Sequence, residues 1–286
     1  MARRTLPQLA HHYRLYALVR STDVAQAAEF AMRGVTPIHG DLDRPETLQR
    51  LAGLADLVLH FAPPPERGNH DTRTRHLIAA LQRGKILPRR IVYISTSGVY
   101  GDCGDAWVSE TRAATPRTPR AWRRVDAERQ LRRWGRSGGP VVSILRAHGI
   151  YAAERLPVER IRRGDPVLRS EDDVFTNHIH ADDLARCALA ALRLGRPNRV
   201  YHASDDSARP GLKMAEWFDA VAAAYALPRP RRVSRAEAEK LLAPLTLSFM
   251  SESRRLDNTR IKRELRVRLR YPDVAAGLKS IRRQCS

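Results

Sequence analysis

The sequence predicts an α/β fold with a doubly wound, mostly parallel sheet and a smaller lobe toward the C-terminal end. Short apolar or β-branched runs recur along the first two thirds of the chain, each as long as a buried strand. Segments with helix-type spacing lie between most of these runs. Strands that alternate with helices need crossover connections, which place parallel strands side by side and cover both faces of the sheet with helices.

The expected elements follow one another in chain order. Pro45 fits the first turn of its helix, because that turn needs no N–H group from the residue. After Ser204 the alternation stops, and helices expected at Lys213–Ala224 and Arg235–Leu242 are followed by an Arg-rich segment that reaches Arg270. The expected strands are Arg14–Val19, Leu57–Ala62, Arg90–Ser95, Val141–Arg146 and Arg199–Ala203, and the earlier expected helices are Val24–Met32, Pro45–Leu54, Asp71–Arg83, Arg120–Arg133 and Asp182–Leu194.

The length of 286 residues suits one enlarged α/β domain or a main domain with a small second one. We expect residues 1–150 and 177–204 to form the sheet domain. Residues 151–176 and 205–286 are expected to form the smaller lobe, because the strand-helix alternation is absent from them.

The formal net charge of +20 is the most unusual bulk property, and Arg supplies 46 of the 51 cations. A basic surface can attract nucleic acid, but these residues are spread along the chain, which favours a solvated, Arg-rich surface. No apolar run approaches the roughly 18 residues of a membrane helix, and no secretion signal opens the chain, so we expect a cytoplasmic protein. Cys103, Cys187 and Cys285 form no C-x-x-C pair and indicate neither a disulfide framework nor a zinc site.

Motifs in a fixed order carry a resemblance to a known family. The most specific is the run from Arg90 to Asp102, in which an apolar strand leads into Ser95-Thr96-Ser97 and then Tyr100. Together the motifs resemble those of the NAD-dependent epimerase/dehydratase family, the extended short-chain dehydrogenases/reductases. The other motifs are Gly40-Asp41-Leu42, Leu59-His60-Phe61-Ala62, Leu145–Tyr151, Asn177–Leu184, which includes His180-Ala181-Asp182-Asp183-Leu184, and Tyr201–Asp205.

The resemblance implies a Rossmann-like domain that binds NAD(P). It places the active-site hydroxyl at Thr96, with Ser97 beside it. Arg20 follows the first expected strand, where an arginine would accommodate the 2′-phosphate of NADP and slightly favours that cofactor; an ordinary surface arginine is the alternative. The residues expected to contact the cofactor are Arg20, Asp41, Leu42, Phe61, Ala62, Pro63, Arg124, Ala147, His148 and Gly149.

The chain departs from the family at its start. Family members open with a strand and a G-x-x-G-x-x-G turn that brings backbone N–H groups to the pyrophosphate. Here residues 2–10 resemble the last turns of the helix that follows this turn, and Tyr13–Val19 is already the second strand. We therefore expect in-frame codons before Met1 to encode the strand and the turn; the alternative is a rebuilt fold. Cofactor binding is in doubt without this segment.

The second departure concerns proton transfer. Family enzymes use a Tyr-x-x-x-Lys pair, in which the lysine lowers the pKa of the tyrosine. Alignment on Glu128 places arginines at both positions, Arg120 and Arg124. A guanidinium stays protonated and is a poor general base, although Arg124 could still hold a ribose hydroxyl or an anion. Tyr100 and Tyr151 are nearby candidates for a substitute phenol.

Histidines near the end of the sheet domain raise the possibility of a metal site. His178 and His180 share one face of an expected strand, and Asp182 follows them. The resemblance favours hydrogen-bonding support and a helix cap at these positions, so we predict no metal site.

We hypothesise an atypical NAD(P)-binding protein that acts on a sugar nucleotide or a small carbonyl or hydroxyl substrate. Whether it is an enzyme stays open, because the usual acid-base pair is absent. The alternative is a non-catalytic nucleotide-sensing or regulatory protein on the same scaffold. Nucleic-acid binding by charge alone is a third, less favoured hypothesis, and the resemblance is compatible with a homodimer.

Overall fold

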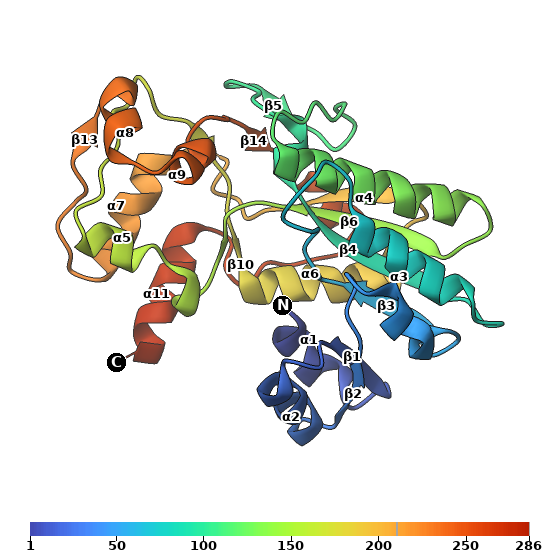
Figure 1. The fold of residues 1–286 in the computed structure, drawn as a ribbon. Helices are drawn as coiled ribbons and strands as arrows, with labels where there is room; N and C mark the ends of the chain where they lie inside the picture. The colour runs from blue at the N-terminus through green and yellow to red at the C-terminus, as the bar shows by residue number, and fades with distance from the viewer. Residues whose placement is uncertain (210, 286) are drawn as a thin grey trace. The chain divides into compact units, whose positions relative to one another are not determined.

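The computed structural model describes residues 1–209 and 211–285, and the chain packs as two compact units (Figure 1). The first unit consists of residues 1–95, 116–145 and 188–200, and the second of residues 96–115, 146–187 and 201–286. Each unit has its own buried apolar cluster. The domain boundaries expected from the sequence stay a prediction.

Strands and helices alternate along the first unit, as the sequence predicts. The expected elements are present with similar bounds, except that the helix beginning at Pro45 is a short 3-10 helix. One strand was not expected, because Pro37 interrupts its apolar run. The elements are α1 (Ala2–Leu9), β1 (Leu15–Val19), α2 (Val24–Met32), β2 (Val35–His39), η1 (Pro45–Leu51), β3 (Leu57–His60), α3 (Thr72–Gln82), β4 (Arg90–Thr96), α4 (Pro119–Arg136), β6 (Val141–Ala147), the last part of α6 (Ala181–Leu194) and the start of β11 (Arg199–Ala203).

Parallel pairing organises these strands. β3 pairs in parallel with β4, and the four-stranded sheet has the order β11-β6-β4-β3. β1 and β2 form a separate parallel pair in which Leu15 lies opposite Val35. α3 and α4 lie side by side (Figure 1). Their inward side chains pack with residues of the sheet, including Leu77 and Leu131 against Ile91. These features confirm the predicted α/β class.

β1 and β3 are more exposed than β4 and β6, the interior strands of the four-stranded sheet. All residues of β1 and β3 except the last of each are partly exposed, whereas the interior of β4 and of β6 is buried. Within residues 1–209 and 211–285, no strand pairs with the second edge of β1 or of β3. Apolar side chains of both strands, Tyr16 and Leu18 of β1 and Val58 of β3, border the same buried cluster. Among the described residues, β1 and β3 therefore each have one unpaired edge, and both strands border the same apolar core.

The second unit contains short paired strands and several helices. Its apolar cluster gathers around Trp217 and Phe218 with Leu278 and Ile281. The helices at Met214–Ala224 and Arg235–Leu241 were expected; the helix at Val158–Arg162 and those that follow Leu241 were not. The elements are η2 (Ser97–Tyr100), β5 (Trp107–Val108), β7 (Ile150–Tyr151), η3 (Ala153–Arg155), α5 (Val158–Arg162), β8 (Val167–Leu168), β9 (Phe175–Thr176), β10 (Ile179–His180), β12 (Leu212–Lys213), α7 (Met214–Ala224), β13 (Arg232–Val233), α8 (Arg235–Leu241), α9 (Pro244–Phe249), β14 (Arg255–Leu256), α10 (Thr259–Leu265) and α11 (Val274–Cys285).

The acidic pair at the start of α6 includes a buried structural carboxylate. Asp183 is fully buried and accepts hydrogen bonds from the backbone N–H groups of Arg270 (2.9 Å) and Tyr271 (2.8 Å). Buried N–H groups need acceptors, so this carboxylate holds the segment before α11 in place.

Several absences apply to the described residues alone. In the part of the chain that the structure describes, no helix is both long and apolar enough to cross a bilayer. Over the same residues, no three His, Cys, Asp or Glu side chains are grouped as metal ligands. Cys103 and Cys187 are free thiols, and the side chain of Cys285 lies outside the described part.

We predict that acid destabilises the protein through three buried histidines. Burial lowers the pKa of His60, His178 and His202 to about 3. Below pH 6.5 the unfolded chain binds protons that the folded chain does not. The free energy of unfolding should therefore fall by roughly 1.4 kcal/mol per pH unit for each histidine as pH drops from 6.5 toward 3. Asp205, whose pKa burial raises to about 8, opposes this effect. Asp71, Glu110 and Asp173, whose carboxyl pKa values burial raises by less, oppose it to a smaller extent.

Urea unfolding at pH 7.0 and 5.5 measures the effect. The exposed His12 serves as control, because His12→Gln should leave the pH dependence unchanged. Equal or greater stability at pH 5.5 would contradict the burial of three neutral imidazoles.

Candidate functional site

A hollow of about 200 Å³ lies at the carboxyl ends of β1 and β2 in the first unit. Arg20 and Arg44 bring positive charge to it, and Ser21 and Thr22 bring hydroxyl groups. Both guanidinium groups are largely exposed and have local acidic partners, Asp23 and Glu46 respectively. The remaining lining residues are His39, Gly40, Asp41 and Thr47.

The turn after β2 is shaped by close packing and by hydrogen bonds. A Cβ at Gly40 would lie 3.0 Å from both Leu18 Cδ1 and the Thr47 carbonyl oxygen, so a side chain there would require these neighbours to move by a few tenths of an ångström. The Asp41 N–H donates to Thr47 Oγ1 (2.8 Å), and Asp41 Oδ1 accepts from the Asp43 N–H (2.9 Å). Leu42 is buried. Gly40 and Asp41 of the predicted turn therefore line the hollow, whereas Leu42 packs in the apolar cluster, and the cofactor contact predicted for it stays a prediction.

The segment after β3 supplies the next predicted contacts. Phe61 and Ala62 are partly exposed, and Pro63 is exposed. Arg73 donates to the Pro63 carbonyl oxygen (3.1 Å) and pairs with Asp43 at 2.6 Å, which lowers the pKa of that carboxyl. Arg73 of α3 therefore holds this loop in place by a hydrogen bond to its backbone.

A buried polar chain lies beneath this loop. His60 Nε2 is 2.9 Å from Thr74 Oγ1, which donates to Asp71 Oδ2 (2.7 Å). Asp71 also accepts from the Thr74 N–H as the cap of α3, and burial raises its pKa. Since Thr74 Oγ1 donates to Asp71, it accepts from His60, and the chain fixes the end of β3 to the start of α3.

Arg124, which the resemblance aligns with the family's lysine, makes its contacts to β4 within the first unit. Its Nη1 donates to the Ile94 carbonyl oxygen (2.7 Å) and to the Tyr93 hydroxyl (3.0 Å), with the guanidinium 5.6 Å from the Tyr93 ring centroid. Arg120 is exposed on α4. The contacts of Arg124 support β4, and its predicted contact with a ribose stays a prediction.

In the second unit, the turn after β4 begins at Thr96. This partly exposed residue caps η2, since its Oγ1 accepts from the Gly98 N–H (3.2 Å). Ser97 is fully buried, and its Oγ lies 2.8 Å from Nδ1 of the half-buried His148. The sequence suggested a reactive role for Ser97 and a cofactor contact for His148. Their pairing was not expected, because 51 residues separate them and no periodicity connects them.

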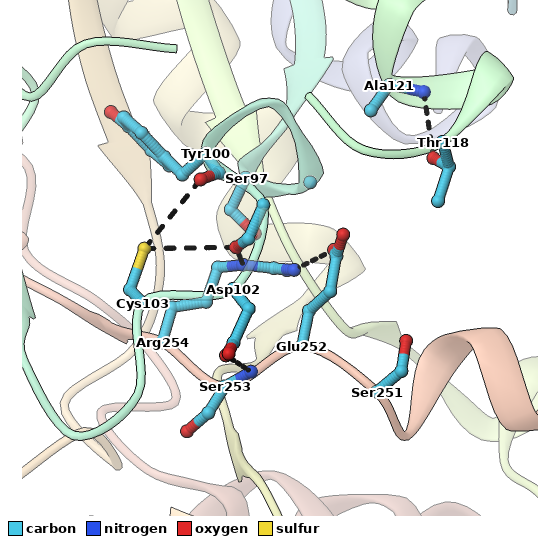
Figure 2. A network of polar contacts seen from close by, with 12 residues as sticks. Ser97, Tyr100, Asp102, Cys103, Thr118, Ala121, Ser251, Glu252, Ser253 and Arg254 are labelled. Atoms are coloured by element: carbon cyan, nitrogen blue, oxygen red, sulfur yellow. Dashed lines mark hydrogen bonds and ion pairs between the residues drawn. The ribbon is translucent and has the colours of Figure 1, made fainter. Parts of the chain in front are cut away.

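The segment after Ser97 is held by a dense polar network (Figure 2). The Gly101 carbonyl oxygen accepts from Arg254 Nε (3.0 Å), and Arg254 also pairs with Glu252. Asp102 Oδ1 accepts from the Ser253 N–H (2.8 Å), and the Cys103 thiol points to the carbonyl oxygens of the preceding turn. These contacts fix the loop that follows η2.

Neither tyrosine considered as a substitute phenol is available at the surface. Tyr100 is fully buried, and its hydroxyl lies 2.6 Å from His202 Nε2, while Arg146 stacks over its ring at 4.7 Å. Tyr151 is buried between His180 and Trp217, and burial raises the pKa of its phenol far above the usual value. Both side chains belong to the packing of the second unit.

His178 and His180, which were considered as metal ligands, are part of the packing of the second unit. His178 stacks on Trp217 with ring centroids 4.2 Å apart, and His180 Nδ1 accepts from the Asp182 N–H (3.2 Å). A Cβ at Gly149 would lie 2.3 Å from the Asn177 carbonyl oxygen, so the β6–β7 connection passes directly against this strand segment. Ala147, just before it, is buried. The roles predicted for Ala147 and Gly149 toward a cofactor stay predictions.

Comparisons with known proteins point to one family. A family model described as NAD(P)H-binding matches residues 1–194. The dTDP-D-glucose 4,6-dehydratase of Bos taurus is 24% identical over 181 residues, which cover 56% of this chain and 50% of that protein. Its Homo sapiens counterpart is 25% identical over 167 residues, 51% of this chain and 47% of that protein. The chain thus spans about half the length of these curated relatives.

Solved structures show the same fold over nearly the whole chain. A functionally unknown conserved protein from Silicibacter pomeroyi DSS has a TM-score of 0.79 and 26% identity, with 99% of this chain and 94% of that chain covered. The dTDP-glucose 4,6-dehydratase DesIV from Streptomyces venezuelae, with NAD and TYD bound, has a TM-score of 0.76 and 23% identity, with 99% and 92% covered.

We predict that Arg124 contributes to stability through its contacts with β4. Arg124→Leu removes the donor to the Ile94 carbonyl oxygen and the charge over Tyr93, and should lower the free energy of unfolding by about 1–3 kcal/mol. Arg129→Leu, at an exposed position of the same helix, is the control and should change it by less than about 0.5 kcal/mol. Urea unfolding at pH 7 compares the two variants. Equal stability for both would show that the Arg124 contacts contribute nothing.

Proposed function

This chain belongs to the NAD(P)H-binding family, and from that membership we propose an atypical epimerase/dehydratase-like protein that binds a nicotinamide dinucleotide. The observation that carries the proposal is the hollow beyond β1 and β2 with its two guanidinium groups and two hydroxyls. In open α/β sheets, ligands bind beyond the carboxyl ends of the strands, where this hollow lies.

The chemistry of the hollow favours the adenosine end of the cofactor, and NADP over NAD. Arg20 and Arg44 match a 2′-phosphate, because guanidinium groups bind phosphate oxygens by charge-assisted hydrogen bonds. Ser21 and Thr22 can donate to the same oxygens. For the pyrophosphate the fit is incomplete: within residues 1–209 and 211–285, no Gly-rich turn connects a strand to a helix N-terminus. We therefore derive no pyrophosphate contact from these residues.

The substrate class is proposed from the relatives and from Thr96. The relatives named above are dehydratases of dTDP-glucose, so a sugar nucleotide is the first candidate and a small carbonyl or hydroxyl compound the second. The partly exposed Thr96 is the last residue of β4, where its hydroxyl can hydrogen-bond a substrate oxygen. The nicotinamide, when bound, supplies hydride transfer.

A non-catalytic nucleotide-sensing role is the second candidate. It is favoured by the arginines at both positions of the Tyr-x-x-x-Lys pair and by the engagement of Arg124 with β4. Dinucleotide binding is common to both candidates, and only turnover separates them.

We predict that Arg20 confers preference for NADPH. Arg20→Glu replaces attraction to the 2′-phosphate with repulsion and should weaken NADPH binding at least about tenfold, with NADH affinity within about threefold of the unchanged protein. Arg50→Glu makes the same charge change at an exposed position outside the hollow and is the control. Calorimetric titration measures all three proteins. Equal NADPH affinity for the Arg20 and Arg50 variants would remove the case for NADP.

A further inference from the structure

A second hollow, of about 170 Å³, lies within the second unit. It is bordered by the loop that follows β11, by the segment that leads from β14 into α10, and by Trp107 of β5. Each of its lining residues belongs to the second unit, and none of them lines the hollow at β1 and β2. The function proposed above therefore leaves the second hollow unexplained.

Arg209 brings a positive charge without an ion-pair partner to the second hollow. Its guanidinium lies over the Trp107 ring, 4.6 Å from the ring centroid, and the indole is 40% exposed. Among the side chains that the structure describes, no carboxylate forms an ion pair with this exposed arginine. A guanidinium that stacks on an aromatic ring keeps its N–H groups in its own plane, where they can bind an oxyanion. The stacking therefore orients Arg209 and leaves its donors for a ligand.

The two carboxyl groups that line the second hollow do not cancel this charge. Asp206 Oδ1 accepts a hydrogen bond from the Asn258 amide (2.8 Å), and the same oxygen pairs with the Lys262 ammonium. Asp205 is buried, its Oδ2 has no hydrogen-bond partner within the described residues, and burial raises its pKa to about 8. At pH 7 Asp205 is mostly protonated and neutral. The lining therefore has a net positive charge, which comes from Arg209.

Hydrogen bonds hold the walls of the second hollow in place. The Asn258 amide donates to the carbonyl oxygens of Ser204 (2.9 Å) and Asp205 (3.0 Å) and so connects the two segments. The Arg209 N–H donates to the Asp206 carbonyl oxygen (3.0 Å), and β5 pairs in parallel with β14. A ligand that enters a preformed hollow loses less free energy to ordering its site.

We propose that the second hollow binds the phosphate group of a small molecule, with Arg209 and Lys262 as the donors. A guanidinium can form two parallel N–H···O bonds to a phosphate, and an ammonium has three N–H donors, of which Asp206 accepts one. Two cationic side chains favour the charge of a phosphate, which approaches −2 at neutral pH, over that of a carboxylate. The proposal goes beyond the dinucleotide site and does not depend on it.

Calorimetric titration at pH 7.0 and constant ionic strength tests the proposal, with sodium phosphate, glucose 1-phosphate and sodium acetate as probes. Arg209→Gln and Lys262→Gln should each weaken phosphate binding at least about tenfold, because each removes a charged donor. Arg229→Gln, at an exposed position of the same unit outside the second hollow, is the matched control and should leave the affinity within about threefold. Equal phosphate affinity for the Arg209 and Arg229 variants overturns the proposal.

The probes also separate the possible ligands. Comparison of sodium phosphate with glucose 1-phosphate distinguishes a free phosphate from a phosphate ester, and acetate that binds as tightly as either overturns the assignment of a phosphate. Arg209→Gln should leave NADPH affinity within about threefold. A protein that binds phosphate in this way but fails to bind NADPH rejects the proposed function and leaves this inference standing.

Tryptophan fluorescence locates the bound phosphate. Phosphate that binds Arg209 changes the surroundings of the indole beneath it, so the unchanged protein should show a saturable change in fluorescence with the calorimetric affinity. Trp107→Phe keeps an aromatic ring under the guanidinium and should bind phosphate within about threefold, but the fluorescence change should disappear. A fluorescence change that persists in Trp107→Phe places the phosphate elsewhere and overturns the proposal.

Discussion

Parallel strand pairing is the constraint on which the candidate site depends. When strands run in parallel, their carboxyl ends fall on one edge of the sheet, and the residues that follow them gather there. Arg20 follows β1 and Gly40 follows β2, and both line the hollow. The apolar strands fix where these residues emerge, and the turns after them carry the chemistry. A change in strand register would displace each of them together.

The polar groups buried beside these turns explain why several motif residues have no direct role. Asp183 holds two backbone N–H groups, and Asp71 caps α3 while joined to His60 through Thr74. His202 similarly lies against the Tyr100 hydroxyl. Each of these groups costs free energy to bury and is acceptable only because it is hydrogen-bonded. They position the turns without reaching a ligand.

The fold could be predicted from the sequence because its strands and helices have different hydrophobic periods, and β4 and β6 follow the predicted runs closely. β2 escaped prediction because Pro37 interrupts it, although proline is compatible with its place at the edge of a two-stranded pair. The site was less predictable. The Gly40-Asp41-Leu42 turn was found because its residues are adjacent, but the pairing of Ser97 with His148 depends on the tertiary fold and leaves no trace in local spacing.

The same limit explains why the missing Tyr-x-x-x-Lys pair carries less weight than the sequence suggests. A local motif can disappear while its chemical role passes to residues that are distant in the chain, because catalysis requires positioned atoms and not a particular spacing. Arg124 donates hydrogen bonds to the Ile94 carbonyl oxygen and to the Tyr93 hydroxyl of β4. This position of α4 therefore offers no proton acceptor. Ser97 and His148, which are 51 residues apart in the chain and within hydrogen-bond distance in the fold, show how tertiary structure brings such distant side chains together.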